Sequence, residues 1–137
     1  MSEAYTGGCA CGAIRYEIPT EPVMTNDCQC RDCQHESGTG HGSHLTFART
    51  LVTLTGEAQH WDMVGDSGNV KTRGFCPNCG SPVYLVFAAM PDLFSVRAAS
   101  LDDPARYQPQ MVTYGVRGHA WDRVDPALPK FEKMPPQ

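Results

Sequence analysis

Alternating apolar and polar residues predict a chain built mostly of short strands. In residues 13–18, isoleucine and tyrosine alternate with charged residues, which is typical of a half-buried strand. Residues 82–88 form an almost unbroken apolar run, the pattern of a strand buried on both faces. Residues 93–98 alternate again and are expected to pair with that run as a hairpin. Further strands are expected at residues 44–47, 51–55, 58–63, 70–75 and 110–114.

The glycine and proline content limits the amount of helix. Thirteen glycines and 11 prolines leave little room for long helical segments. Residues 102–106 predict one short helical turn, with an aspartate as the N-cap and Pro104 in the first turn. We therefore predict a mainly β fold of short antiparallel strands with little helix.

The length of 137 residues predicts one domain with a modest core. We expect the domain to span residues 1–137, with its core at about 5–121. The tail at residues 122–137 is rich in proline, so it is expected to run extended over the surface. No internal repeat or linker indicates a second domain.

Charge and the length of the apolar runs exclude nucleic acids and membranes as partners. Eleven Lys and Arg residues against 15 Asp and Glu residues give a net charge of −4, so the basic face of a nucleic-acid-binding protein is missing. No apolar run reaches the ~18–20 residues of a membrane span. No basic segment followed by an apolar one predicts a secretory signal, so we expect a cytoplasmic protein.

Seven cysteines are the main chemical feature of the chain, and all of them fall into three short clusters. An odd number cannot pair completely, and thiols in a reducing compartment more often bind metal than form disulfides. The clusters are a CxC pair, a CxCxxC group and a CxxC pair followed by glycine: Cys9 and Cys11; Cys28, Cys30 and Cys33; Cys76 and Cys79.

The CxxC pair falls at a turn between two predicted strands. Cys76 and Cys79 follow the strand at 70–75 and precede the one at 82–88. Gly80 suits such a turn because it has no Cβ and tolerates a positive φ. We expect backbone N–H groups in this turn to point at the sulfurs, as in a zinc knuckle.

Seven sulfurs divide naturally into four and three. Structural zinc sites take four protein ligands, whereas catalytic zinc sites often take three and keep one position open. The CxCxxC group supplies three thiolates from one short segment, which suits an open site. The remaining four cysteines would form a closed site that joins distant segments and stabilises the fold.

Two other divisions remain open at this stage. Cys30 and Cys33 would form a zinc ribbon with Cys76 and Cys79, although the 42 residues between the pairs exceed the usual ~15–20. Alternatively, a histidine completes the CxCxxC group and closes that site too, which would describe a non-catalytic module with two structural zinc sites. The candidate histidines are His35, His41 and His44.

Four ordered motifs resemble the GFA family, named for glutathione-dependent formaldehyde-activating enzyme (S-(hydroxymethyl)glutathione synthase), which includes the centromere protein V domain. The resemblance runs from about Gly7 to Trp121, which is most of the chain. The motifs are Gly7-Gly-Cys-Ala-Cys-Gly-Ala-Ile-Arg-Tyr16, Cys28-Gln-Cys-Arg-Asp-Cys33 followed by Ser37-Gly38, Phe75-Cys-Pro-Asn-Cys-Gly-Ser81, and Ser100-Leu-Asp-Asp-Pro104.

The resemblance implies a zinc-binding, tent-like β fold and a carbon–sulfur lyase that acts on the adduct of glutathione and formaldehyde. The chain departs from the family at Ala10 and Gln29, where histidine is common. By resemblance, the structural zinc ligands are Cys9, Cys11, Cys76 and Cys79, and the catalytic zinc ligands are Cys28, Cys30 and Cys33.

An open three-cysteine zinc could take a substrate thiolate as its fourth ligand, because zinc favours sulfur. Glutathione is such a thiol, and its two carboxylates need cations. Arg31, inside the CxCxxC group, is the candidate placed best by sequence, and Arg73 and Arg97 are further candidates. Aromatic residues that could line a pocket are Phe47, Trp61, Phe87 and Tyr114.

Overall fold

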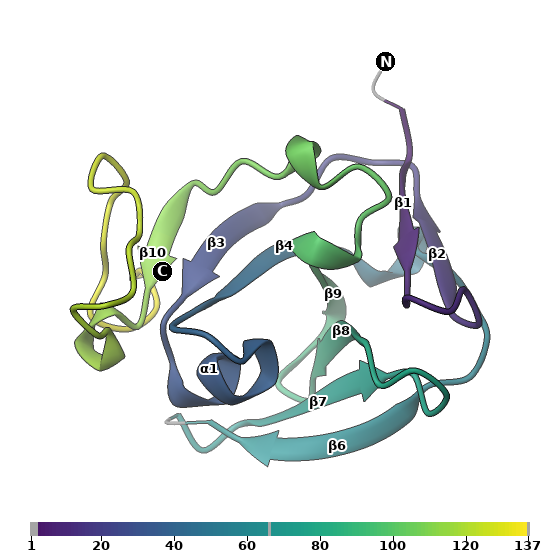
Figure 1. Ribbon diagram of the computed structural model, residues 1–137, viewed down its shortest axis with the longest axis horizontal. Coiled ribbons are helices and arrows are strands. Elements are labelled where there is room, and N and C mark those ends of the chain that lie inside the picture. The colour runs from purple at the N-terminus through teal and green to yellow at the C-terminus, as the bar shows by residue number, and fades with distance from the viewer. Residues whose placement is uncertain (1–2, 66, 137) are drawn as a thin grey trace.

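Two β-sheets form the body of the protein in a computed structural model that describes residues 3–65 and 67–136. One sheet has three strands in the order β1-β2-β5. The other has seven, in the order β10-β3-β4-β9-β8-β7-β6 (Figure 1). The prediction of a mainly β fold is confirmed.

The smaller sheet is antiparallel and consists of β1 (Tyr5–Gly8), β2 (Arg15–Ile18) and β5 (Thr53–Thr55). In β2, Tyr16 and Ile18 are buried while Glu17 is exposed, as the alternation predicts. The sequence did not predict β1, because two of its four residues are glycine and carry no side-chain pattern.

The larger sheet contains the hairpin that the apolar run predicts, since β8 pairs with β9 in antiparallel register. One expectation is wrong: β10 pairs with β3 in parallel, because the chain returns to that edge through a long connection after β9. The strands are β3 (Met24–Cys28), β4 (Gly42–Ala48), β6 (Gln59–Val64), β7 (Val70–Phe75), β8 (Pro82–Phe87), β9 (Met90–Arg97) and β10 (Met111–Thr113).

Helix is scarce among the described residues, as expected. The single α-helix in the described part of the chain, α1 (Arg31–Ser37), is separated from β3 by two residues and was not predicted. Pro104 begins a short 3-10 turn whose N-cap, Asp103, accepts a hydrogen bond from the Ala105 N–H, which confirms the predicted turn. The 3-10 turns are η1 (Arg49–Leu51), η2 (Ala98–Ser100), η3 (Pro104–Arg106) and η4 (Gly115–Arg117).

None of the described helices has the length and apolar character needed to cross a membrane.

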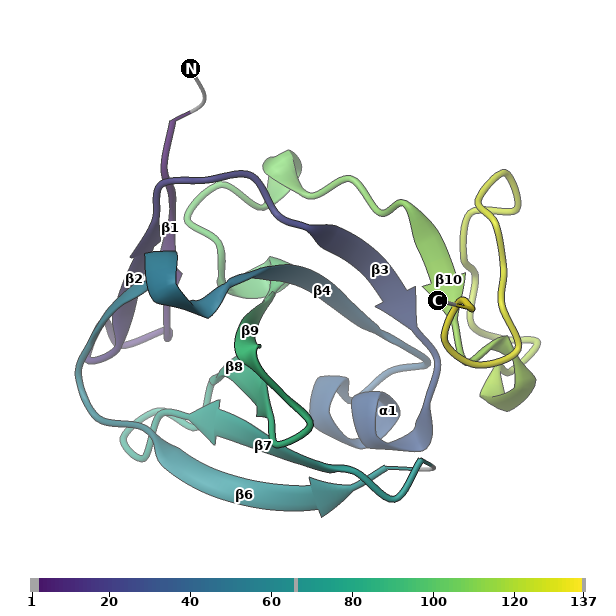
Figure 2. The same cartoon turned by 180° about the vertical axis from the view of Figure 1, so that it is seen from behind.

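The main core joins the smaller sheet to the middle of the larger one. Ile18 of β2 and Ile14, just before that strand, pack in one cluster with Phe47 of β4 and Val96 of β9. All four side chains are fully buried. Figures 1 and 2 show the larger sheet curling so that β3 and β4 lie on one side of α1, and β6 and β7 on the other. The curl therefore places α1 within reach of strands from both ends of the sheet.

The tail at residues 122–136 runs along the outer edge of β10. The Val112 N–H donates to the Pro129 carbonyl at 2.8 Å, and the Phe131 N–H donates to the Val112 carbonyl at 2.9 Å. Most of its residues are half-buried or exposed, as expected for a surface segment.

Candidate metal centres

The four-cysteine cluster brings together two turns that are distant in sequence. Cys9 and Cys11 lie between β1 and β2, and Cys76 and Cys79 lie between β7 and β8. All four sulfurs are within 4.8 Å of one another. The sulfur of Cys11 is 3.7 Å from that of Cys9 and 3.6 Å from that of Cys76. A tetrahedral zinc with Zn–S bonds of about 2.3 Å needs sulfurs about 3.8 Å apart, so the cluster fits this ion.

Backbone N–H groups point at the sulfurs of this cluster, as expected for a knuckle. The Ile14 N–H donates to the Cys9 sulfur at 3.2 Å. The Asn78 and Cys79 N–H groups each lie 3.4 Å from the Cys76 sulfur. These donors stabilise negative sulfurs, which is the chemistry that a thiolate metal site requires.

The turn after Cys76 depends on Gly80. Its φ of 77° lies in the left-handed region, and its N–H donates to the Cys76 carbonyl at 2.8 Å. The next residue, Ser81, accepts a hydrogen bond from the Ala10 N–H at 3.1 Å. The Ser81 hydroxyl, 3.3 Å from the Cys79 sulfur, holds the pKa of that thiol below its usual value.

The three-cysteine cluster is assembled at the junction of β3 and α1. Cys28 ends β3, Cys30 is the N-cap of α1, and Cys33 lies in the first turn of the helix. The sulfurs lie within 4.8 Å of one another and all three residues are buried. The Cys33 N–H points at the Cys30 sulfur at 3.4 Å. The seven sulfurs therefore divide into one cluster of four and one of three, as expected. The zinc-ribbon alternative is wrong, because Cys30 and Cys33 lie in one cluster and Cys76 and Cys79 in the other.

Within residues 3–65 and 67–136, no histidine or carboxylate joins the three sulfurs as a fourth group within 4.8 Å. Nε2 of His35 lies 3.3 Å from Arg31, and Nδ1 of His41 lies 2.9 Å from the Asp122 carboxylate. His44 approaches only one sulfur closely. The cluster therefore offers three protein ligands, which argues against a second closed site.

Without a cation, this cluster favours a single thiolate. Hydrogen bonds from Cys28 and then Cys33, together with the charge of Lys71, hold the pKa of Cys30 well below its usual value. The neighbouring Cys28 and Cys30 sulfurs raise the pKa of Cys33 well above its own. Like charges at this separation cannot all form unaided, so deprotonation of all three thiols requires a bound metal ion.

Lys71 brings a positive charge to the cluster from β7. Its Nζ lies 3.8 Å from the Cys30 sulfur and 3.2 Å from the Asp32 carboxylate. Burial alone lowers the pKa of Lys71, but the charges of the Cys30 and Cys33 sulfurs and of Asp32 raise it above its usual value. Sequence reasoning missed Lys71, because nothing in its local pattern shows that the curled sheet brings β7 against α1.

His44 connects the cluster to a buried ion pair. Its Nε2 lies 3.2 Å from the Cys33 sulfur, and its Nδ1 contacts the Arg97 guanidinium. A guanidinium can only donate, so Nδ1 accepts and the proton sits on Nε2, directed at the sulfur. Burial lowers the pKa of His44 to about 4, which keeps the ring neutral. Arg97 in turn pairs with the buried Glu36. His44 is thus a hydrogen-bond donor to Cys33, with its orientation fixed by Arg97.

The family model described as glutathione-dependent formaldehyde-activating enzyme matches residues 4–117. The chain belongs to the GFA family. A relative in Halomonas elongata, named "Putative glutathione-dependent formaldehyde-activating enzyme", is 26% identical over 112 residues, which cover 77% of this chain and 71% of that protein. The crystal structure of a Rhodobacter sphaeroides protein has the same fold, with a TM-score of 0.58, 17% identity, and coverage of 92% of this chain and 98% of that one.

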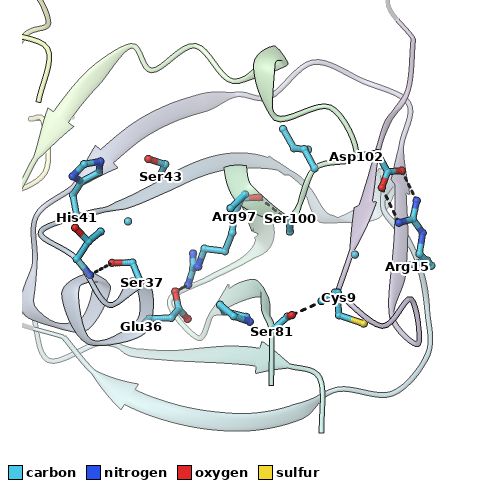
Figure 3. Close-up of a pocket in the computed structure, with 17 residues that line it drawn as sticks. Cys9, Arg15, Glu36, Ser37, His41, Ser43, Ser81, Arg97, Ser100 and Asp102 are labelled. Carbon is cyan, nitrogen blue, oxygen red and sulfur yellow. Dashed lines mark hydrogen bonds and ion pairs between the residues drawn. The ribbon is translucent and has the colours of Figure 1, made fainter. Parts of the chain in front are cut away.

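In this GFA protein the three-cysteine cluster lines a cavity of about 230 Å³, together with Lys71 and His44. A larger cavity of about 710 Å³ is lined instead by Glu36, Arg97 and His41 (Figure 3). Figure 3 shows the side chains of Arg97 and Glu36 directed at each other in this second cavity. The contacts from Cys33 through His44 and Arg97 to Glu36 therefore run from the wall of one cavity to the wall of the other. The smaller cavity is the candidate active site, because it contains the sulfurs.

Of the three arginines predicted to bind the substrate, one lines this cavity. Arg31 lines it, but its guanidinium contacts Gln34 and His35 along α1. Arg97 lines the other cavity and is paired with Glu36, and Arg73 lines neither.

Two of the four aromatic residues predicted to line a pocket do line this cavity, and the other two do not. Phe87 and Tyr114 line the cavity as anticipated. Phe47 is fully buried in the main core, and Trp61 is 60% exposed on β6 outside the cavity. Alternation along a strand places an aromatic ring on a face of the sheet, but it does not reveal which face the active site occupies.

Gln29 lies inside the CxCxxC group, but its side chain is directed to the segment after η4. It is 1% exposed, and its Nε2 donates to the Asp122 carboxylate at 3.1 Å. The same carboxylate binds His41. Gln29 therefore ties the segment after η4 to the start of α1.

Proposed function

We propose that this GFA protein is a zinc-dependent carbon–sulfur lyase-like enzyme of the cytoplasm. It makes and breaks the bond between a thiol sulfur and an aldehyde carbon, and the family description suggests glutathione and formaldehyde as the pair to test first. In this proposal the structural zinc is held by Cys9, Cys11, Cys76 and Cys79, and the catalytic zinc by Cys28, Cys30 and Cys33.

The observation that carries the proposal is a buried three-cysteine cluster at the wall of a cavity. Three sulfurs meet there, and among the described residues no fourth protein group completes the set. When bound, a zinc ion at such a site supplies an open coordination position and favours the deprotonated form of an incoming thiol.

The chain's own polar groups prepare the cluster for one more negative sulfur. The His44 N–H directed at Cys33 and the ammonium of Lys71 near Cys30 both draw charge away from the cysteine sulfurs. In the forward reaction the sulfur–carbon bond forms, the carbonyl double bond opens, and the carbonyl oxygen gains the proton that the thiol loses. The reverse reaction breaks the same bond. Arg31, the predicted arginine that lines this cavity, is the proposed contact for a charged group of the substrate.

Two measurements test this function. Purified protein should contain close to two zinc ions per chain, of which one exchanges more readily with a chelator. Glutathione mixed with formaldehyde should reach adduct equilibrium faster with the protein than without it, and Cys30→Ser should remove the acceleration while the circular dichroism spectrum stays unchanged. Failure to speed the reaction, together with failure to bind any thiol, would contradict the proposal.

A further inference from the structure

Exposed apolar side chains gather around the mouth of the candidate active site. Four of the ten large hydrophobic residues that are exposed in the described chain line this one cavity. They are Val64 of β6, Val70 of β7, Met90 of β9 and Met134 of the tail, with exposed fractions between 36% and 68%. Single exposed hydrophobic residues are ordinary, but a group that surrounds a cavity marks a binding surface for an apolar ligand.

The buried and half-buried lining of the cavity also contains apolar side chains, beside the polar Asn26, Thr46 and Ser95. Leu85 is buried, and Phe87, Met24 and Tyr114 are half-buried around the same space. A ligand whose sulfur lies at the three cysteines therefore has aliphatic and aromatic side chains to contact in the same cavity.

The cations of the cavity already have partners within the chain. Lys71 contacts Asp32 and the Cys30 sulfur, and Arg31 contacts Gln34 and His35. Glutathione carries two carboxylates: Arg31 is the proposed contact for one, and the other would need Lys71 released from Asp32 and the Cys30 sulfur. The cavity, at about 230 Å³, is also smaller than the ~300–1,000 Å³ of sites that enclose larger ligands.

We propose, on the basis of the function proposed above, that the preferred substrate thiol of this site is a small one bearing an aliphatic or aromatic group. Its sulfur binds at the cluster of Cys28, Cys30 and Cys33. Its apolar group packs against Leu85 and Phe87 and under the exposed apolar rim.

Binding to cobalt-substituted protein tests this preference without relying on turnover, because a new thiolate ligand changes the cobalt absorption bands. The series ethanethiol, propanethiol and butanethiol is compared with 2-mercaptoethanol and glutathione at one pH. Each added methylene that enters the cavity should tighten binding by about fourfold. Binding of glutathione or 2-mercaptoethanol as tight as that of butanethiol would overturn the preference and leave the proposed function standing. Absence of a spectral response to every thiol would instead contradict the proposed function.

Substitutions at the rim test where the apolar group binds. The double variant Val64→Thr/Val70→Thr keeps the shape of both side chains and replaces one methyl of each with a hydroxyl. It should weaken butanethiol binding by about tenfold and leave 2-mercaptoethanol binding unchanged. Val23→Thr is the matched control, since Val23 is 63% exposed and lies outside the cavity. Equal effects of the control and the double variant, or no effect of either, would contradict the proposed position of the apolar group.

Discussion

At the scale of single residues, two donors set the charge on the three-cysteine cluster. His44 directs an N–H at Cys33, and Lys71 places an ammonium beside Cys30. Neither residue belongs to a cysteine motif, and both reach the cluster from other strands. The strength with which the cluster holds a metal should therefore depend on residues that the motifs do not contain.

Replacement of His44 should weaken metal binding at this cluster. His44→Phe removes the N–H directed at Cys33 and leaves Arg97 without its acceptor, so we expect a loss of about 10- to 100-fold in affinity for zinc. Competition with a chromogenic chelator measures the affinity, and the sulfur-to-cobalt absorption reports the cluster directly. His60→Phe is the matched control, because His60 binds Tyr84 on β8 and neither cluster. An unchanged affinity and spectrum for His44→Phe would show that the contact has no influence on the metal.

The buried phenol of Tyr16 predicts a loss of stability at alkaline pH. Burial raises the pKa of Tyr16 to about 12, from the usual value of about 10 for a tyrosine. The folded state then holds the proton more tightly than the unfolded state, so its contribution to stability is complete below pH 10 and is lost as the pH rises toward 12. The loss from this one group reaches about 1.4 kcal/mol per pH unit. Urea unfolding between pH 9 and pH 11.5 should show a steeper decline for the wild type than for Tyr16→Phe; parallel curves would refute this.

At the scale of elements, the sequence predicted strands that carry an apolar pattern and missed β1 and β3, which are rich in glycine or polar residues. β2 and the β8–β9 hairpin have strong apolar patterns and were predicted. β3 was not, because its polar residues are buried by partners far away in the sequence. Asn26 donates to the Thr113 hydroxyl at 2.9 Å, and Asp27 accepts hydrogen bonds from Tyr107 and Ser43, each at 2.7 Å. Such partners are invisible until the fold is known.

The candidate site also has a part that the sequence predicted and a part that it did not. Spacing alone grouped the seven sulfurs into four and three, because each cysteine lies within a short motif. The donors to those sulfurs, and the apolar walls of the cavity, come from strands that the curl of the sheet brings together, and no local pattern encodes that curl.

Helix α1 ends at Gly38, and this end should tolerate asparagine better than alanine. Gly38 has a φ of 75° and donates its N–H to the Gln34 carbonyl, while a Cβ there would meet no other atom within 4 Å. Backbone strain is therefore the main cost of substitution. We expect Gly38→Ala to lower the free energy of unfolding by about 1–2 kcal/mol and Gly38→Asn by less. Chemical denaturation of both variants measures the difference, and equal losses would exclude the left-handed backbone as the cause.

At the scale of the whole molecule, the four-cysteine cluster fastens the two sheets to each other. It joins the turn between β1 and β2 of the smaller sheet to the turn between β7 and β8 of the larger one. The three-cysteine cluster links only β3 to the helix that follows it. The two clusters should therefore contribute very differently to global stability.

Paired serine substitutions compare these contributions. Cys76→Ser removes a sulfur that accepts two backbone N–H groups. It should lower the free energy of unfolding by more than about 3 kcal/mol, and the protein should lose one metal ion. Cys30→Ser should lose the other metal ion at a cost within about 1 kcal/mol. Thermal unfolding with metal analysis of each variant measures both quantities. If Cys30→Ser unfolds as readily as Cys76→Ser, the three-cysteine cluster is a structural element as well.

The spacing of the two clusters also sets an order during biosynthesis. Cys79, the last of the four cysteines, follows Cys11 by 68 residues (79 − 11), so at 5–20 residues per second the ribosome completes the set roughly 3–14 s after Cys11 is made. The three-cysteine motif is finished within that interval. The nascent chain therefore presents all three sulfurs of one cluster while the other still lacks Cys76 and Cys79, so a metal ion that arrives in this interval meets three thiols at the first site and two at the second.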